Sequence, residues 1–398
     1  MTAAAKAPGQ VLSSGLVLLM AAATGVAVAS NYYAQPLLPT MARAFGVSPA
    51  GAGCIVTVAQ LGYGLGLLLI VPLGDLVERR GLVVGMSLLA AAGLFTTALA
   101  PSLAMVLVGT ALTGLFSVVA QILVPFAATL AAPERRGQVV GTVMSGLLLG
   151  ILLARTVAGA LADLGSWRTV YWVGGAAMLL AAAVLRRALP RHHDPAGLSY
   201  PRLLLSIAGL FREEPALRLR ALLGATIFAA FSVLWTSMGF LLAAPPYGFS
   251  AGAIGLFGLA GVAGALAASA AGRLGDRGQG ERATGWGLGI LLLSWGLLAL
   301  APRSLVAFAA GVVLLDLAVQ GVHISNQSRI YRLAPEARNR ITAGYMTCYF
   351  VGGATGSLAS AAAYSRAGWT GVTVVGAGVS ALGLALWVGA RRWMTTGR

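Results

Sequence analysis

Long apolar segments recur along this chain of 398 residues and alternate with short polar or charged stretches. Each apolar segment approaches or exceeds the roughly 20 residues that a helix needs to cross the hydrocarbon core of a bilayer. Twelve such segments can be drawn, with approximate cores at 11–34, 52–73, 82–100, 103–130, 138–162, 169–189, 219–243, 250–272, 283–301, 304–328, 340–364 and 369–390. The pattern predicts an all-α membrane protein with twelve transmembrane helices.

The composition favours the same class, since 58% of the residues are hydrophobic and only 10% are charged. No water-soluble domain of this size has that balance. The 54 glycines are typical of helices that pack closely inside a membrane. The first apolar segment is too long for a cleavable signal peptide. Because Cys54 and Cys348 are isolated, we expect neither a disulfide framework nor a metal site, and no cofactor.

Basic residues are distributed unevenly between the predicted loops. The formal net charge of +16 by itself suggests nucleic acid as a partner. If the N-terminus is cytoplasmic, however, 22 of the 27 Lys and Arg residues fall on the cytoplasmic side; Arg155 lies within a span, and Arg43, Arg168, Arg303 and Arg366 lie outside. This bias predicts that both termini are cytoplasmic, in what we expect to be the inner membrane of a bacterium. The basic side would then attract anionic membrane lipids rather than nucleic acid.

The two halves of the chain resemble each other at an almost constant offset. Residues 132–136 match residues 334–338, shifted by 202, and residues 73–75 match residues 274–276, shifted by 201. Two independent loops that agree on one offset are hard to obtain by chance. The repeat predicts a duplicated six-helix unit, as in transporters built from parallel repeats.

We therefore expect two pseudo-symmetric six-helix bundles, residues 1–190 and 219–398, joined by a cytoplasmic central loop at 191–218. Apolar side chains within 201–212 have the spacing of a short helix that would lie at the membrane surface. A plain charged linker explains the composition of this loop equally well.

The loop between the second and third spans carries, in both halves, a motif that resembles the Gly-x-x-x-Asp-Arg-x-Gly-Arg-Arg signature of the major facilitator superfamily. The C-terminal copy begins well at Gly272, whereas the N-terminal copy has Val71, Leu76 and Glu78 in place of the first Gly, the Arg and the second Gly. The resemblance covers almost the whole chain and implies the fold of that superfamily and a monomer. It also implies that a group of charged residues gates the cytoplasmic side: Asp75, Arg79, Arg80, Asp276 and Arg277. A simple positive-inside turn is the alternative for this loop.

Within the superfamily, the chain is most similar to the drug:proton antiporter and metabolite-efflux branch. The segments 31–39 and 166–168 carry this similarity. The fifth-span antiporter motif is kept only in part, because Arg155 stands where proline is expected and alanines replace two glycines. Thr110 occupies the position of a fourth-span arginine that many proton-coupled members have. The resemblance implies proton-coupled efflux, and these departures weaken that expectation.

Asp316 is the only acidic residue deep inside a predicted span. Gln320, His323 and Gln327 follow it at helical spacings that place all four side chains on one face. An ionisable group at bilayer depth costs about 2.5–3.5 kcal/mol or more, so it usually faces a cavity and has a function. We therefore expect Asp316 to bind and release a proton and His323 to relay protons or contact substrate. Asp316 can instead be a structural carboxylate paired with an arginine, and His323 a structural histidine.

Arg155 is the only basic residue near the middle of a predicted span. Its side chain can extend to the outer surface. The alternative is an ion pair with Asp316 in one conformational state, which protonation of Asp316 would break, so that proton binding is coupled to helix movement.

The family resemblance places the first, fourth, seventh and tenth spans around a central cavity. In the repeat register His323 corresponds to Gln121, so these two side chains would face each other across the pseudo-two-fold axis. Together with these two, the candidates for substrate contact are Gln320, Asn31, Tyr32, Gln60, Trp235 and Tyr345. Packing within the bundle is the alternative for the two aromatic residues Trp235 and Tyr345.

The energy source for transport follows from what the sequence lacks. It has no Gly-x4-Gly-Lys-Ser/Thr string for nucleotide binding, so the energy must come from an ion gradient. We expect a secondary transporter that exports a small organic compound in exchange for protons. Proton-coupled uptake or a uniporter is the alternative, and a non-transporting membrane sensor is a minor one. The sequence shows no catalytic triad or metal cluster, so an enzyme is not expected.

Overall fold

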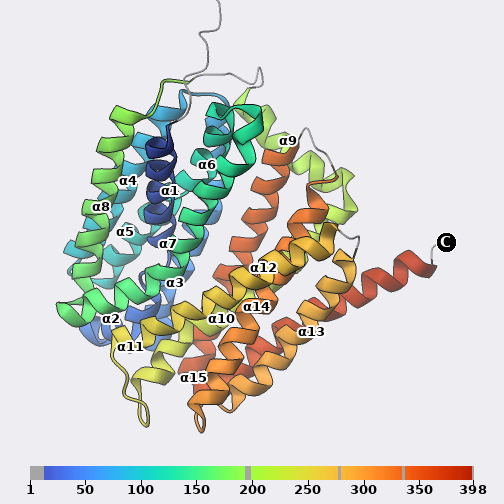
Figure 1. Ribbon diagram of the computed structural model, residues 1–398. Helices are drawn as coiled ribbons and strands as arrows, with labels where there is room; N and C mark the ends of the chain where they lie inside the picture. Colours follow the sequence, from blue (N-terminus) through green and yellow to red (C-terminus); the bar gives the residue numbers. More distant parts are fainter. Residues whose placement is uncertain (1–12, 193–198, 277–278, 334–336, 397–398) are drawn as a thin grey trace, which may run out of the picture.

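The computed structural model describes residues 13–192, 199–276, 279–333 and 337–396, and the regular structure within these ranges is helical (Figure 1). The first half contains α1 (Ser14–Ala29), η1 (Gln35–Leu37), α2 (Leu38–Phe45), α3 (Pro49–Leu69), η2 (Val71–Asp75), α4 (Arg79–Leu99), α5 (Leu103–Phe116), α6 (Val119–Leu130), η3 (Pro133–Arg135), α7 (Arg136–Leu164) and α8 (Trp167–Ala188). The rest contains α9 (Tyr200–Glu213), α10 (Pro215–Ala243), α11 (Ala251–Leu256), η4 (Phe257–Ala260), α12 (Gly261–Asp276), α13 (Gly280–Ala299), α14 (Leu305–Ile330) and α15 (Arg338–Thr396).

These helices account for the twelve predicted spans and confirm the all-α fold. Four of the spans are not separate straight helices. The fourth consists of α5 and α6, and the eighth of α11, η4 and α12. The last two spans are joined in α15, where Ala367 and Gly368 leave helical geometry and Gly368 takes a φ of +57°, a value that suits glycine because it has no Cβ. The helix α9 occupies the segment for which a short helix and a charged linker were both open.

Serine caps mark the beginnings of helices at corresponding places in the two halves. Ser48 and Ser250 begin α3 and α11, and Ser102 and Ser304 begin α5 and α14. In all four, the hydroxyl accepts a hydrogen bond from the amide three residues later, which satisfies one of the free N–H groups of the first turn. Each pair is separated by 202 positions, the offset of the sequence repeat.

Close helix packing recurs in the two halves, at glycines that are 202 positions apart. A Cβ added to Gly150 in α7 would lie 2.3 Å from the carbonyl oxygen of Gly25 in α1. A Cβ added to Gly352 in α15 would lie 2.1 Å from the carbonyl oxygen of Ala225 in α10. Only glycine allows two backbones to approach this closely, which is the usual way in which helices associate without a hydrophobic driving force.

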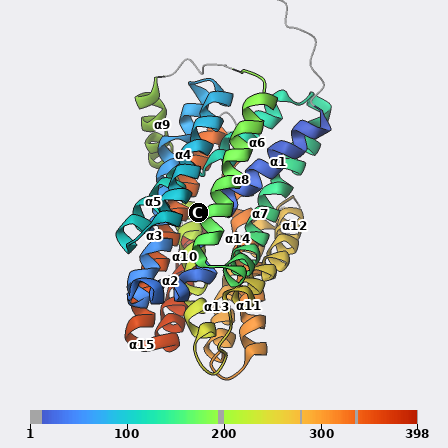
Figure 2. The same cartoon turned by 90° about the vertical axis from the view of Figure 1, so that its left-hand side faces the viewer.

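The two halves meet mainly through α3 with α15 and through α7 with α11. The two halves diverge toward the end of the molecule at which α9 lies, away from α11 (Figure 1). The view turned by 90° likewise has α9 and α11 at opposite ends (Figure 2). The helices of the two halves therefore lie closer together at the α11 end than at the α9 end.

Candidate functional site

A cavity of about 790 Å³ occupies the space between the halves. Helices α1, α3, α6 and α7 line it from one half, and α10, α12, α14 and α15 line it from the other. At the α9 end its wall includes Asp75, Arg79 and Arg340, whereas Arg155 and Asp316 lie at its deep end. The cavity therefore connects a charged rim with two buried groups of opposite charge.

One face of α14 follows the length of this cavity. Asp316, Gln320, His323 and Gln327 all line it, as the helical spacing predicts. The N-terminal half contributes Gln121 from α6, so that Gln121 and His323 line the same cavity from different halves. Asp316 is the most deeply placed of the α14 series and only 3% exposed.

Trp235 of α10 connects Asp316 with Arg155. Its indole Nε1–H donates a hydrogen bond of 3.2 Å to the Asp316 carboxylate. The guanidinium carbon of Arg155 lies 3.9 Å from the centroid of the Trp235 ring, which is a close cation–π contact. Within the described residues, no direct ion pair between Arg155 and Asp316 is formed; the indole contacts both groups instead.

Arg155 is enclosed by groups from both halves and is 2% exposed, so its side chain does not extend to the outer surface. Its Nε donates a hydrogen bond of 2.5 Å to the Gln35 side-chain oxygen. The guanidinium also lies 4.7 Å from the Tyr32 ring centroid and 5.4 Å from that of Phe231. Its Nη2 has no hydrogen-bond partner within the described part of the chain.

His323 interacts with aromatic side chains of α15. Its Nδ1 lies 3.0 Å from the Tyr345 hydroxyl, and its ring centroid lies 4.7 Å from that of Tyr349. The Tyr345 hydroxyl also accepts a 3.5 Å hydrogen bond from the Asn326 amide. Tyr345 therefore forms a hydrogen bond with the His323 ring but does not itself line the cavity.

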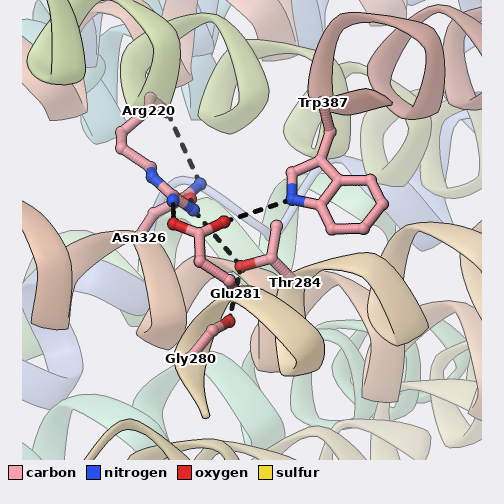
Figure 3. A network of polar contacts seen from close by, with 6 residues as sticks. All are labelled: Arg220, Gly280, Glu281, Thr284, Asn326 and Trp387. Atoms are coloured by element: carbon pink, nitrogen blue, oxygen red, sulfur yellow. Dashed lines mark hydrogen bonds and ion pairs between the residues drawn. The ribbon is translucent and has the colours of Figure 1, made fainter. Parts of the chain in front are cut away.

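Asn326 belongs to a second polar network, which ties together four helices of the C-terminal half (Figure 3). Arg220 of α10 forms an ion pair with Glu281 of α13 and donates hydrogen bonds to Thr284, at 3.3 Å, and to Asn326 of α14, at 3.2 Å. Trp387 of α15 donates to the other Glu281 oxygen. From the sequence, Arg220 was counted only among the basic residues of the cytoplasmic side. Its position inside α10, together with an acidic residue near the start of α13, was the signal that could have predicted this ion pair.

The remaining predicted contact residues divide into two groups. Asn31 and Tyr32 line the cavity. Trp235 lies behind the cavity wall, where it contacts Arg155, and does not line the cavity. Gln60 is 2% exposed and is not part of the cavity wall; its amide atoms find no hydrogen-bond partner among the described residues.

The predicted gating residues of the N-terminal motif lie at the α9 end. The Arg79 guanidinium lies 3.8 Å from the Asp75 carboxylate. It also donates two hydrogen bonds of 3.1 Å, one to the Gly74 carbonyl and one to the Thr129 hydroxyl. Arg80 donates to the Leu189 carbonyl at 3.3 Å. In the C-terminal copy of the motif, Asp276 is the last residue of α12, but its side chain and all of Arg277 lie outside the described residues.

Glu78, which departs from the family motif, is the N-cap of α4. Its two carboxylate oxygens accept hydrogen bonds of 2.8 Å from the amides of Arg80 and Gly81. Partial burial alone would raise the pKa of Glu78, but the hydrogen bonds from Gly81, Arg80 and His192 outweigh it and lower the pKa. A carboxylate at this position satisfies free N–H groups and interacts favourably with the helix dipole.

The end of the molecule opposite α9 is closed by contacts between the halves. The Asp163 carboxylate of α7 accepts hydrogen bonds from the Ser250 hydroxyl, at 2.6 Å, and from the Gly252 amide, at 3.0 Å, at the beginning of α11. The Ala50 amide of α3 donates to the Ser365 hydroxyl of α15 at 2.9 Å. The cavity wall therefore reaches charged residues at the α9 end, while hydrogen bonds join the two halves at the other end.

Comparison with known proteins agrees with this architecture. The family model described as Major Facilitator Superfamily matches residues 20–294 and 221–392. The chain is 60% identical over 380 residues to the uncharacterized transporter YgaY of Escherichia coli O157:H7, which covers 96% of each protein. It is 34% identical over 373 residues to SCO4007 of Streptomyces coelicolor, which covers 93% of this chain and 86% of that protein.

A solved structure shares the fold. It is the bacterial homolog of the human lysosomal transporter Spinster, with a TM-score of 0.77 and 14% identity over 97% of this chain and 98% of that one. Two six-helix halves, a cavity between them and a family match over most of the sequence all agree. The chain is thus a multi-pass membrane transporter rather than an enzyme, and it belongs to the Major Facilitator Superfamily.

Proposed function

We propose that this transporter moves a small organic compound by alternating access and couples the movement to protons, with Asp316 as the proton carrier. The observation that supports this most directly is the position of Asp316. Its carboxylate is buried at the deep end of the cavity, accepts a hydrogen bond from Trp235 and forms no direct ion pair within the described residues. A carboxyl group in such a place can exchange its proton without first breaking a salt bridge.

The two ends of the cavity differ in the way expected of a carrier that alternates between two states. Asp163 holds α7 against α11 at one end, while Asp75 and Arg79 lie on the wall of the cavity at the other. The bias of basic residues supports an orientation in which the α9 end faces the cytoplasm and both termini are cytoplasmic, in a bacterial inner membrane. Each end would open and close by movement of the two six-helix halves, 1–190 and 219–398, about the central site, while the connecting segment 191–218 stays cytoplasmic. The monomer and its surrounding lipids suffice for this cycle.

We propose export by proton exchange as the direction, because the chain resembles the drug:proton antiporter and metabolite-efflux branch. Protons and substrate would then occupy the cavity in turn. Gln121, Gln320, His323 and Asn31 supply polar contacts on its wall, and Arg155 and His323 assist proton coupling. Tyr32 and Trp235 shape the apolar surroundings of the deep end.

Proton-coupled uptake is the second candidate, and one observation favours it. Arg155 has an unpartnered donor at the deep end of the same cavity, close to Asp316. A negatively charged substrate at Arg155 and a proton on Asp316 would leave the loaded site with less net charge than either alone. Substrate and proton would then bind together, which is the behaviour of a symporter.

Growth of a pump-deficient bacterial host on a panel of toxic compounds and metabolites tests the direction. Cells would carry wild type, Asp316→Asn, Asp316→Glu or empty vector at matched membrane expression. Protection by wild type and Asp316→Glu that Asp316→Asn loses supports proton-coupled export. Greater sensitivity with wild type supports uptake. Protection that Asp316→Asn retains would exclude Asp316 as the proton carrier.

A further inference from the structure

The deep end of the cavity contains a charged group with an unused hydrogen-bond donor. Arg155 is 2% exposed, its Nε is bonded to Gln35, and its Nη2 has no partner among the described residues. An arginine keeps its charge in proteins, and a buried, unpaired charged donor is costly. A protein retains such a group where a ligand completes its hydrogen bonds.

The neighbouring carboxylate does not fulfil this role in the present state. Asp316 accepts from the Trp235 indole, and the Trp235 ring face is what the Arg155 guanidinium contacts. The aromatic ring gives the guanidinium a cation–π contact, which leaves the hydrogen-bonding edge of Nη2 unused. The site thus provides one free cationic donor beside one carboxyl group that can be neutralised by a proton.

The charge and shape of this donor select a class of ligand. A guanidinium matches a carboxylate in charge and in planar hydrogen-bonding geometry. A single guanidinium next to Asp316 balances one negative charge, so a dianion such as a phosphate monoester would remain uncompensated. A monoanion is therefore the favoured ligand.

The walls of the cavity select the rest of the molecule. Tyr32 and Phe231 flank the guanidinium, and Phe228, Tyr349 and Phe350 continue the wall from there. The ring centroids of Phe228 and Tyr349 are 4.0 Å apart and those of Phe228 and Phe350 are 5.1 Å apart, so these rings form one continuous surface. An aryl or alkyl body packs well on such a surface.

We propose that the substrate is a small amphipathic monocarboxylic acid whose carboxylate binds Arg155 and whose apolar body lies against this aromatic wall. The proposal rests on the proposed transport function, since it requires substrate passage through this cavity, and it deepens the second candidate, proton-coupled uptake. With Asp316 protonated, the bound acid leaves the site with no net charge, which favours proton symport over exchange.

Ligand-induced thermal stabilisation of the purified full-length protein in detergent tests this inference. The probes are benzoate, 3-phenylpropionate and octanoate, each compared with its neutral primary amide, which keeps the shape but lacks the charge. For wild type we expect at least one acid to bind about ten-fold or more tightly than its amide. If no acid binds better than its amide, the proposal is wrong.

Variants locate the contact. Arg155→Gln should abolish the difference between acid and amide, and Arg155→Lys should restore part of it. Arg340→Gln is the matched control, since Arg340 lines the same cavity at its α9 end and should leave the difference intact. Discrimination that survives in Arg155→Gln, or that disappears in Arg340→Gln but not in Arg155→Gln, would overturn the assignment.

Asp316→Asn separates this inference from the proposed function. Asparagine resembles the protonated acid, so the variant should still bind the acids in detergent although its coupled transport is lost. Loss of transport without any acid preference in wild type would leave Asp316 as the proton carrier and remove the carboxylate proposal. Acid preference in wild type together with full transport by Asp316→Asn would support the carboxylate proposal and exclude Asp316 as the proton carrier.

Discussion

At the scale of single residues, Trp235 determines how the two buried charges are related. Its N–H holds the Asp316 carboxylate and its ring face holds the Arg155 guanidinium, so the indole separates two groups that would otherwise attract each other. An ion pair between them would need the indole to move. In the function proposed above, this arrangement would keep Asp316 available for a proton and Arg155 available for an anion.

A double-mutant cycle measures the bond between the indole and the carboxylate. Trp235→Phe keeps an aromatic ring but removes the N–H donor. A hydrogen bond to a charged group contributes about 1.5–3 kcal/mol, so Trp235→Phe and Asp316→Ala, which removes the acceptor, should be non-additive by a similar amount in thermal unfolding. Trp295→Phe with Asp316→Ala is the control, because Trp295 is equally buried but donates to Ser380. Additive effects in both pairs would disprove the coupling.

At the scale of the helices, packing and capping determine whether the scaffold holds the site. In each half a glycine lies directly on the backbone of the helix that begins that half, and serine caps begin helices at matching positions. The remaining glycines of α7 need not share this role. Gly141 also matches the family's antiporter motif, but a Cβ added there would meet nothing within 4 Å.

Alanine substitutions in α7 test which glycines are structural. Gly150→Ala should destabilise the protein by about 1–3 kcal/mol or more, because its Cβ would collide with backbone that cannot rotate away. Gly141→Ala, in the same helix, should leave the melting temperature nearly unchanged. The melting temperature and the yield of monodisperse protein report the difference. Equal behaviour of the two variants would show that α1 and α7 are not packed as described.

The cap of α4 gives an expectation for pH. Because the pKa of Glu78 is lowered in the folded state, its contribution is present above the ordinary glutamate pKa and is lost as the pH falls through the lowered value. Glu78→Gln should therefore be less stable than wild type near neutral pH, and the two should converge in acid. Thermal unfolding between about pH 7 and pH 3 would show this. A stability difference that does not change with pH would mean that the carboxylate charge is not what stabilises α4.

At the scale of the whole molecule, function depends on which end of the cavity is sealed. The contacts of Asp163 with Ser250 and Gly252 join α7 of one half to α11 of the other. Few such bonds hold the closed end, so the loss of two of them should shift the population of states. The population should shift toward a conformation in which the cavity opens at the α11 end.

Thiol labelling from the outside of intact cells measures this shift. The probe is Leu152→Cys, one turn from Arg155 on the cavity wall, in a background in which Cys54 and Cys348 are alanine. We expect Asp163→Ala to increase the rate of labelling by a membrane-impermeant reagent several-fold. Leu164→Ala is the control, since this neighbour is 85% exposed and should have no effect. Unchanged labelling in Asp163→Ala would argue against a latch at this end.

The sequence by itself determined the number of spans and the polar face of α14. These features are local: span length follows from the thickness of the bilayer, and a polar face follows from helical periodicity. The repeat offset likewise indicated two related halves, and caps and close glycine contacts recur at that offset. The fold and the run from Asp316 to Gln327 along the cavity could therefore be predicted.

Only the tertiary structure decided what the buried charges contact. The Trp235–Asp316 bond joins residues 81 positions apart, and the Arg155–Gln35 bond joins residues 120 positions apart. Gln60 does not line the cavity, and Arg220 belongs to a network of four helices. Both facts likewise depend on contacts between residues far apart in the sequence. The side-chain pattern of one helix does not specify which neighbouring helix it meets or at what height. Those contacts arise from the packing of all helices together, and they place the Arg155 guanidinium and the Asp316 carboxylate at the deep end of this cavity.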